Sequence, residues 1–123
     1  MLLDTYAWVE LFRATPLGEK VRELIDQKPT FASAATYAEL TTWALKNHLD
    51  SEQALSRMER LAGVLPLDRT ILQAAGQITH YRKRFVRHWS LVDGMIYATA
   101  QAYGLQVVTG DQDFRGLPGV VLL

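Results

Sequence analysis

The stretch from Leu105 to Phe114, LQVVTGDQDF, constrains the fold of this chain more than any other. Gly104 precedes a short apolar run, Leu105–Val108, and the polar turn after it contains Asp111 and Asp113. A short apolar run between turn signals is typical of a buried strand in a parallel sheet. Ligands and catalytic groups in such sheets lie beyond the carboxyl ends of the strands. We therefore predict that both aspartates lie at a functional edge of a sheet.

Other short apolar runs alternate with helical patterns along the chain. They predict further strands at residues 1–3, 30–34, 63–67 and 120–123, and Pro66 suggests an edge position for the third of these, because proline cannot donate to a central ladder. Strands that alternate with helices favour a parallel sheet with helices on both faces. The 123 residues are enough for one domain, so residues 1–123 are expected to form a single α/β unit.

The predicted helices begin at capping residues. The candidates are Asp4 or Thr5, Thr15 before Pro16, Ser33 or Thr36, Asp50 or Ser51, Asp68, and Ser90. Thr36 and Glu39 also have the spacing of a capping box. The helix after Ser90 is apolar on every side, which predicts that it is buried, yet Asp93 lies within it.

Composition limits the class of protein. The 13 basic and 13 acidic residues balance, and no apolar run approaches the roughly 20 residues that span a bilayer. Met1–Asp4 does not resemble a signal peptide. The chain has no cysteine, which excludes disulfides and thiolate metal sites. We therefore expect a cytoplasmic protein without a membrane segment.

Acidic residues are expected to converge at one edge of the sheet. Asp4 follows the first strand, Asp111 and Asp113 follow the fourth, and Glu39 and Asp93 lie near the starts of helices. Several carboxylates in one cleft would repel one another unless a cation neutralised them. Oxygen ligands favour Mg²⁺ or Mn²⁺, and bound divalent ions suit phosphodiester hydrolysis. The pattern thus predicts a magnesium-dependent phosphodiesterase.

Within this set, Asp4, Glu39 and Asp93 are expected to bind one ion. Asp111, with Asp93 and Asp113, would hold a second ion or tune the first, so one-ion and two-ion mechanisms both remain open. Thr5 and Thr109 are candidates to orient a ligand, a water or a phosphate oxygen.

Each acid also has a simpler structural explanation. Asp4 fits a helix N-cap, Glu39 a capping-box partner of Thr36, and Asp111 and Asp113 ordinary turn residues beside Gly110. Asp93 fits a capping box with Ser90, although its apolar neighbours suggest burial, where an unpaired carboxylate is costly. The joint placement of the acids carries the prediction.

Four short motifs resemble the PIN domain family. They are Leu2-Leu3-Asp4-Thr5, Tyr37-Ala38-Glu39-Leu40, the segment Ser90–Ala100 (SLVDGMIYATA) and Val108–Phe114 (VTGDQDF). Their order and spacing over nearly the whole chain are most similar to VapC-type toxins of toxin–antitoxin pairs. The resemblance implies a three-layer α/β/α sandwich, a metal-dependent endoribonuclease, a homodimer, and a cognate antitoxin that blocks the active site.

By position, the resemblance assigns Asp4, Glu39, Asp93 and Asp111 to the acidic quartet. It makes Asp113 an accessory acid, Thr109 the hydroxyl residue before the last acid, and Ser90 the small polar residue that opens the buried helix. Gly110 stands where many relatives carry a larger, often basic residue.

A basic and aromatic run, His80–Trp89, precedes the Asp93 helix. Its cations, Arg82, Lys83, Arg84 and Arg87, could bind RNA phosphates while the aromatic residues stack on bases. A solvated helix end that complements the helix dipole is the alternative.

Two other functions remain to be weighed against a ribonuclease. A small-molecule phosphohydrolase would need a second acid two residues after Asp4, where the chain has Tyr6. A non-catalytic scaffold would have no reason to bind Mn²⁺.

Overall fold

Five short strands form one sheet in the computed structural model, which describes residues 1–123. The strands are β1 (Leu2–Leu3), β2 (Phe31–Ser33), β3 (Gly63–Leu65), β4 (Val107–Thr109) and β5 (Val120–Leu122). All neighbouring strands are parallel, and their order is β3-β2-β1-β4-β5. This confirms the α/β class, and β3 lies at an edge as Pro66 suggested. The sheet is wholly rather than mostly parallel.

The fourth strand begins two residues later than the sequence predicted. Leu105 instead caps the end of the preceding helix, because its backbone N–H donates to the carbonyl of Ala100 at 2.9 Å, while Gly104 adopts a φ of +64°. The strand extends instead to Thr109, whose hydroxyl therefore reaches the carboxyl edge of the sheet.

Six helices flank the sheet. They are α1 (Thr5–Phe12), α2 (Pro16–Gln27), α3 (Ala35–Lys46), α4 (Ser51–Leu61), α5 (Arg69–Arg82) and α6 (Leu91–Ala102), and a 3₁₀ turn, η1 (Gln112–Phe114), follows β4. None of the helices combines the length and the hydropathy needed to cross a membrane.

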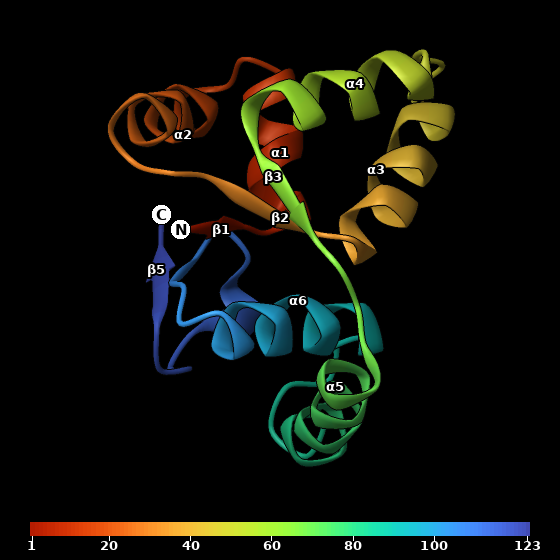
Figure 1. Ribbon diagram of the computed structural model, residues 1–123, viewed down its shortest axis with the longest axis vertical. Helices are drawn as coiled ribbons and strands as arrows, with labels where there is room; N and C mark the ends of the chain where they lie inside the picture. The colour runs from red at the N-terminus through yellow and green to blue at the C-terminus, as the bar shows by residue number, and fades with distance from the viewer.

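The helices form two layers, one on each face of the sheet (Figure 1). Leu3 and Val108 point to the face covered by α1, α2, α3 and α4, where Trp8 is fully buried. Leu2 and Val107 point to the opposite face and pack with Ile96 on α6. This alternation follows from the two-residue period of a strand. The result is the expected three-layer α/β/α sandwich.

On the second face, α6 lies directly against the sheet and α5 packs on the outside of α6 (Figure 1). The close approach of the two helices depends on Gly94, where a side chain would meet the hydroxyl of Thr79 and the carbonyl of Ala75. Helix α6 is thus buried from two sides, which explains its apolar pattern.

Candidate active site

The carboxyl ends of β1 and β4 open into a cleft of about 780 Å³. β1 is the central strand, and the chain moves to one side of it through β2 and to the other through β4, so the cleft lies at the switch point where parallel sheets bind ligands. Besides Glu10, four acids from distant parts of the sequence line it: Asp4, Glu39, Asp93 and Asp111. The structure therefore brings the predicted quartet together.

Asp4 is the most buried of these acids, with only 3% of its surface exposed. It caps α1 by accepting a hydrogen bond from the backbone N–H of Thr5 at 2.8 Å. Its other carboxylate oxygen accepts from the Thr109 hydroxyl at 2.7 Å. Because β1 and β4 are neighbours, the residues at their ends necessarily meet. Asp4 is thus both a helix cap and a site residue.

Glu39 does not form the capping box with Thr36 that its spacing allowed. The cap residue of α3 is Ala34, which offers no side-chain hydrogen bond, so Thr36 lies inside the helix and is fully buried. Glu39 instead accepts a 2.7 Å hydrogen bond from the hydroxyl of Thr5 on α1. The carboxylate is therefore held at the cleft by a neighbouring helix.

Asp93 does form the predicted capping box. The Ser90 hydroxyl accepts from the Asp93 N–H at 3.1 Å, and one Asp93 oxygen accepts from the Ser90 N–H at 2.8 Å. This exchange fixes the side chain at the start of α6 with 9% of its surface exposed. The cap explanation and the site explanation are therefore compatible.

Asp111 and Asp113 are ordered by a chain of local hydrogen bonds. The Thr109 hydroxyl accepts from the Asp111 N–H at 3.0 Å, and Asp111 accepts from the Asp113 N–H at 2.9 Å, which caps η1. Both side chains are partly exposed. One carboxylate oxygen each from Asp93, Asp111 and Asp113 lie within 4.8 Å of one another.

This cluster fits a hard divalent cation. Its donors are all carboxylate oxygens, and the chain supplies no histidine or cysteine to it. Oxygen-only donor sets suit Mg²⁺ and Mn²⁺ rather than Zn²⁺. Asp4 and Glu39 lie in the same cleft without belonging to the tightest cluster.

Comparison with known proteins identifies the family. The model of the PIN domain family matches residues 1–120. This chain belongs to the PIN domain family. Among curated proteins, none matches the sequence significantly.

Solved structures share the fold of this PIN domain along nearly its whole length. A toxin–antitoxin complex from Klebsiella pneumoniae is 26% identical, with a TM-score of 0.77 over 98% of this chain and 94% of that one. FitAcB from Neisseria gonorrhoeae is 29% identical, with a TM-score of 0.72 over 99% and 96%. DNA-bound VapBC from Salmonella typhimurium is 25% identical, with a TM-score of 0.70 over 99% and 95%.

Three acids in the cleft of this PIN domain, Asp4, Glu39 and Asp93, have raised pKa values when no cation is bound. Burial raises the pKa of Asp4 to about 7, and the charges of Asp93, Glu39 and Asp111 add to the shift, while the Thr109 hydrogen bond opposes it. Burial likewise raises the pKa of Asp93 to about 6 and raises the pKa of Glu39. The negative charge of Asp111 adds to both shifts. A bound cation would offset this repulsion.

The outer wall of the cleft was not anticipated from the sequence. Helix α1 contributes Tyr6, Val9, Glu10 and Arg13, and α3 contributes Trp43 and Lys46. The four α1 residues recur every three or four positions, as do Glu39, Trp43 and Lys46 on α3, so each set shares one helix face. Steps of four positions from Thr5 lead to Val9 and Arg13, and steps of four and then three from Glu39 lead to Trp43 and Lys46, so the sequence held part of this signal.

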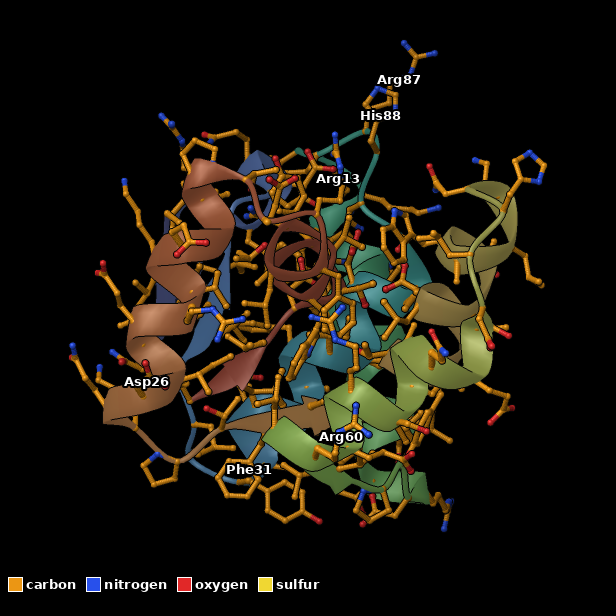
Figure 2. All side chains as sticks on the ribbon, turned by 90° about the horizontal axis from the view of Figure 1, so that it is seen from above. Arg13, Asp26, Phe31, Arg60, Arg87 and His88 are labelled. Carbon is orange, nitrogen blue, oxygen red and sulfur yellow. The ribbon has the colours of Figure 1, made fainter.

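The basic run His80–Trp89 lies outside the lining of the cleft, whose cations are Arg13 and Lys46. Arg84 and Arg87 are exposed, and Figure 2 shows Arg87 extending away from the body of the molecule. Arg82 differs, because its side chain is half-buried and donates to backbone carbonyls. Trp89, whose role the sequence did not indicate, is buried at 1% exposure.

Proposed function

We propose that this PIN domain is a metal-dependent endoribonuclease that hydrolyses RNA phosphodiester bonds. The observation that carries the proposal is the convergence of Asp4, Glu39, Asp93 and Asp111 in one cleft at the switch point of the sheet. Four carboxylates from four separate segments serve no shared structural purpose, and burial, together with repulsion between the acids, raises the pKa values of Asp4, Glu39 and Asp93. A divalent cation makes the arrangement favourable.

Mg²⁺ is the proposed cofactor, and Mn²⁺ is expected to substitute for it. Asp4, Glu39, Asp93 and Asp111 hold the metal, with Asp113 as a further ligand. A bound ion lowers the pKa of water and stabilises the charge that develops on a phosphate. The protein supplies orientation: Thr109 fixes the carboxylate of Asp4, Thr5 that of Glu39, and Ser90 that of Asp93.

The residues around the metal cluster favour a nucleic-acid substrate. Arg13 and Lys46 lie in the same cleft as the acids and are suited to backbone phosphates. Tyr6 stands at the cleft with 42% of its surface exposed, which leaves ring surface for stacking on a base. Lys83, Arg84 and Arg87 are exposed cations beyond the cleft and would extend the contact along a strand.

The biological role that we propose is the toxin of a type II toxin–antitoxin system. Two relatives at 25% identity or more are described as a toxin–antitoxin complex and as VapBC. On this chain, Trp43 lines both the active-site cleft and a second hollow of about 180 Å³ that also includes Phe12 and Leu49. Leu45 and Leu49 are exposed nearby. An antitoxin segment seated on these apolar residues would close the cleft.

We further propose a homodimer in the cytoplasm. Large apolar side chains are exposed on and after α5, with Phe85 at 83% exposure and Tyr81 at 60%, and a second copy would remove such surface from water. Light scattering on the purified protein measures the mass directly. A monomeric mass at micromolar concentration would contradict the homodimer.

The decisive experiment is cleavage of total cellular RNA by protein freed of any antitoxin. Reactions contain Mg²⁺, Mn²⁺ or EDTA, and compare the wild type with Asp93→Asn. Asp26→Asn is the matched control, because Asp26 is exposed near the end of α2, at the edge of the molecule (Figure 2). We expect metal-dependent cleavage by the wild type and by Asp26→Asn, and a loss of at least about 100-fold in Asp93→Asn.

Two other results would overturn the proposal. Turnover of p-nitrophenyl phosphate without RNA cleavage would identify a small-molecule phosphohydrolase, although no second acid follows Asp4 on the first strand. Neither cleavage nor Mn²⁺ binding by folded protein would leave a non-catalytic scaffold.

A further inference from the structure

Arg82 connects the end of α5 to the acidic turn after β4. It is the last residue of α5, and its Nη2 donates to the carbonyl of Asp113 at 2.6 Å and to that of Arg115 at 2.7 Å. These partners lie 31 and 33 residues further along the chain. Charge-assisted hydrogen bonds from one guanidinium group therefore hold the middle of the short turn and the residue that follows it.

Aromatic packing fixes the guanidinium in place. It lies over the ring of Trp89, 5.5 Å from the centroid, and Trp89 packs on Phe114 with the two centroids 4.9 Å apart. Trp89 also donates to the Thr79 hydroxyl at 3.3 Å. Phe114 is fully buried and is the last residue of η1. Arg82 thus bonds to the backbone of the turn, and Trp89 packs on its Phe114 side chain.

The turn held in this way carries metal-site carboxylates. Asp111 caps η1 and Asp113 lies within it, and their oxygens come within 4.8 Å of an oxygen of Asp93. Asp93 is on α6, which packs closely on α5. Arg82 therefore bonds to the segment that brings two of the three clustered carboxylates beside the third.

The other cations of the basic run make no comparable contacts. Lys83, Arg84 and Arg87 are exposed, and Arg84 merely lies over the ring of Tyr81. Arg82 uses its donors on carbonyls and even leaves its buried Nε without a partner, a cost that the two charge-assisted bonds offset. It is thus not available to bind phosphate in the way that its neighbours are.

We propose that Arg82 is a positioning residue of the metal site. It holds η1 so that Asp111 and Asp113 can share a cation with Asp93. This inference rests on the proposed metal-dependent function, but metal affinity, which does not require RNA, tests it separately. Outer residues that orient metal ligands typically change metal affinity by about 10–100-fold when replaced.

The test measures Mn²⁺ affinity by electron paramagnetic resonance of the free ion. It compares the wild type with Arg82→Met, Arg82→Lys and the control Arg84→Met, which removes the same charge from an exposed neighbour. Loss of a positive charge alone would strengthen Mn²⁺ binding. Positioning predicts the opposite sign: Arg82→Met binds about 10–100-fold more weakly, Arg82→Lys recovers part of the affinity, and Arg84→Met does not weaken binding.

Thermal unfolding of each variant separates positioning from general destabilisation. All affinities are measured well below the unfolding midpoint, where a merely structural role leaves Mn²⁺ binding unchanged. If Arg82→Met does not fold, Arg82→Lys carries the test, because lysine retains the charge but not the planar group over Trp89. It must then bind Mn²⁺ more weakly than the wild type.

Several results would overturn the inference. Unchanged or tighter Mn²⁺ binding by folded Arg82→Met would do so, as would weaker RNA binding with normal Mn²⁺ affinity, which would make Arg82 a phosphate contact. A wild type that binds no Mn²⁺ would refute both this inference and the proposed function. Normal Mn²⁺ binding without RNA cleavage would refute the function alone.

Discussion

Asp4 both stabilises and destabilises the fold: its hydrogen bonds are favourable, whereas the burial of its charge is unfavourable. Its carboxylate caps α1 and bonds to Thr109, yet burial and the neighbouring acids raise its pKa to about 7. In the metal-free protein near neutral pH, the charge on Asp4 therefore opposes folding. Protonation of Asp4 or a bound cation would neutralise this unfavourable negative charge.

This conflict predicts an unusual pH dependence. Because the pKa of Asp4 in the folded protein lies above its ordinary value of 3.8, the folded state binds more protons between about pH 4 and pH 7. The free energy of unfolding, measured by urea titration in EDTA, should therefore fall by on the order of 2–4 kcal/mol as pH rises through this window. Asp4→Asn should flatten the fall and be more stable than the wild type at pH 8.

Asp26→Asn is the control, since Asp26 is exposed on α2. If the free energy of unfolding fell equally with pH in the wild type and in Asp4→Asn, the charge on Asp4 would not destabilise the metal-free protein.

Gly94 makes a second prediction at the scale of one residue. A Cβ there would lie 2.8 Å from the carbonyl of Ala75, and this backbone atom can move only if α5 moves. Gly94→Ala should lower the free energy of unfolding by about 1–3 kcal/mol. Gly76→Ala is the matched control, because a Cβ at Gly76 meets nothing within 4 Å and alanine favours a helix. Equal stabilities for the two variants would contradict the close packing of α5 on α6.

At the scale of elements, the sequence was informative wherever the signal was local. Apolar runs with turn residues located all five strands, and Pro66 located the edge, because both signals lie within a few residues of what they predict. The role of Glu39 was ambiguous because local spacing cannot settle it. Its position, three after Thr36, fits a capping box, but it fits equally well the observed hydrogen bond to Thr5 on another helix. Only the packing of α1 beside α3 distinguishes the two.

The role of Arg82 could not be predicted, because its partners lie more than 30 residues away and offer only backbone carbonyls. Carbonyl acceptors are present at every position and leave no mark on the sequence. The sequence therefore does not distinguish Arg82, which bonds within the protein, from the exposed cations of the same run. The acids were easier to place, since parallel strands bring their ends to one edge.

The exposed part of the basic run gives a prediction for the α5–α6 connection. Arg84→Ala combined with Arg87→Ala should weaken binding of single-stranded RNA and reduce the slope of log affinity against log salt by about 1.4, since each phosphate contact contributes about 0.7. Fluorescence anisotropy in the Asp93→Asn background measures both without cleavage. Lys20→Ala with Arg22→Ala, on the exposed face of α2, should leave the slope unchanged. An unaltered slope in the first pair would confine RNA to the cleft.

For the whole molecule, the site is a product of topology. The two helical layers hold α1, α3 and α6 against the central strands, so that four acids spread over more than 100 residues meet in one cleft (Figure 1). We expect that removing any one acid would leave the fold intact and the proposed metal site incomplete. Metal binding should also release protons near pH 6–7, because Asp4 and Asp93 have raised pKa values in its absence.

Calorimetric titration of Mn²⁺ tests whether the four acids share a metal site. The wild type is compared with Asp4→Asn, Glu39→Gln, Asp93→Asn and Asp111→Asn, and with the control Glu10→Gln, which lines the same cleft away from the cluster. A metal site shared by the four acids predicts binding by the wild type and Glu10→Gln, with proton release, and affinity at least about tenfold weaker in each of the four acid variants. Full Mn²⁺ affinity in folded Asp93→Asn and Asp111→Asn would contradict it.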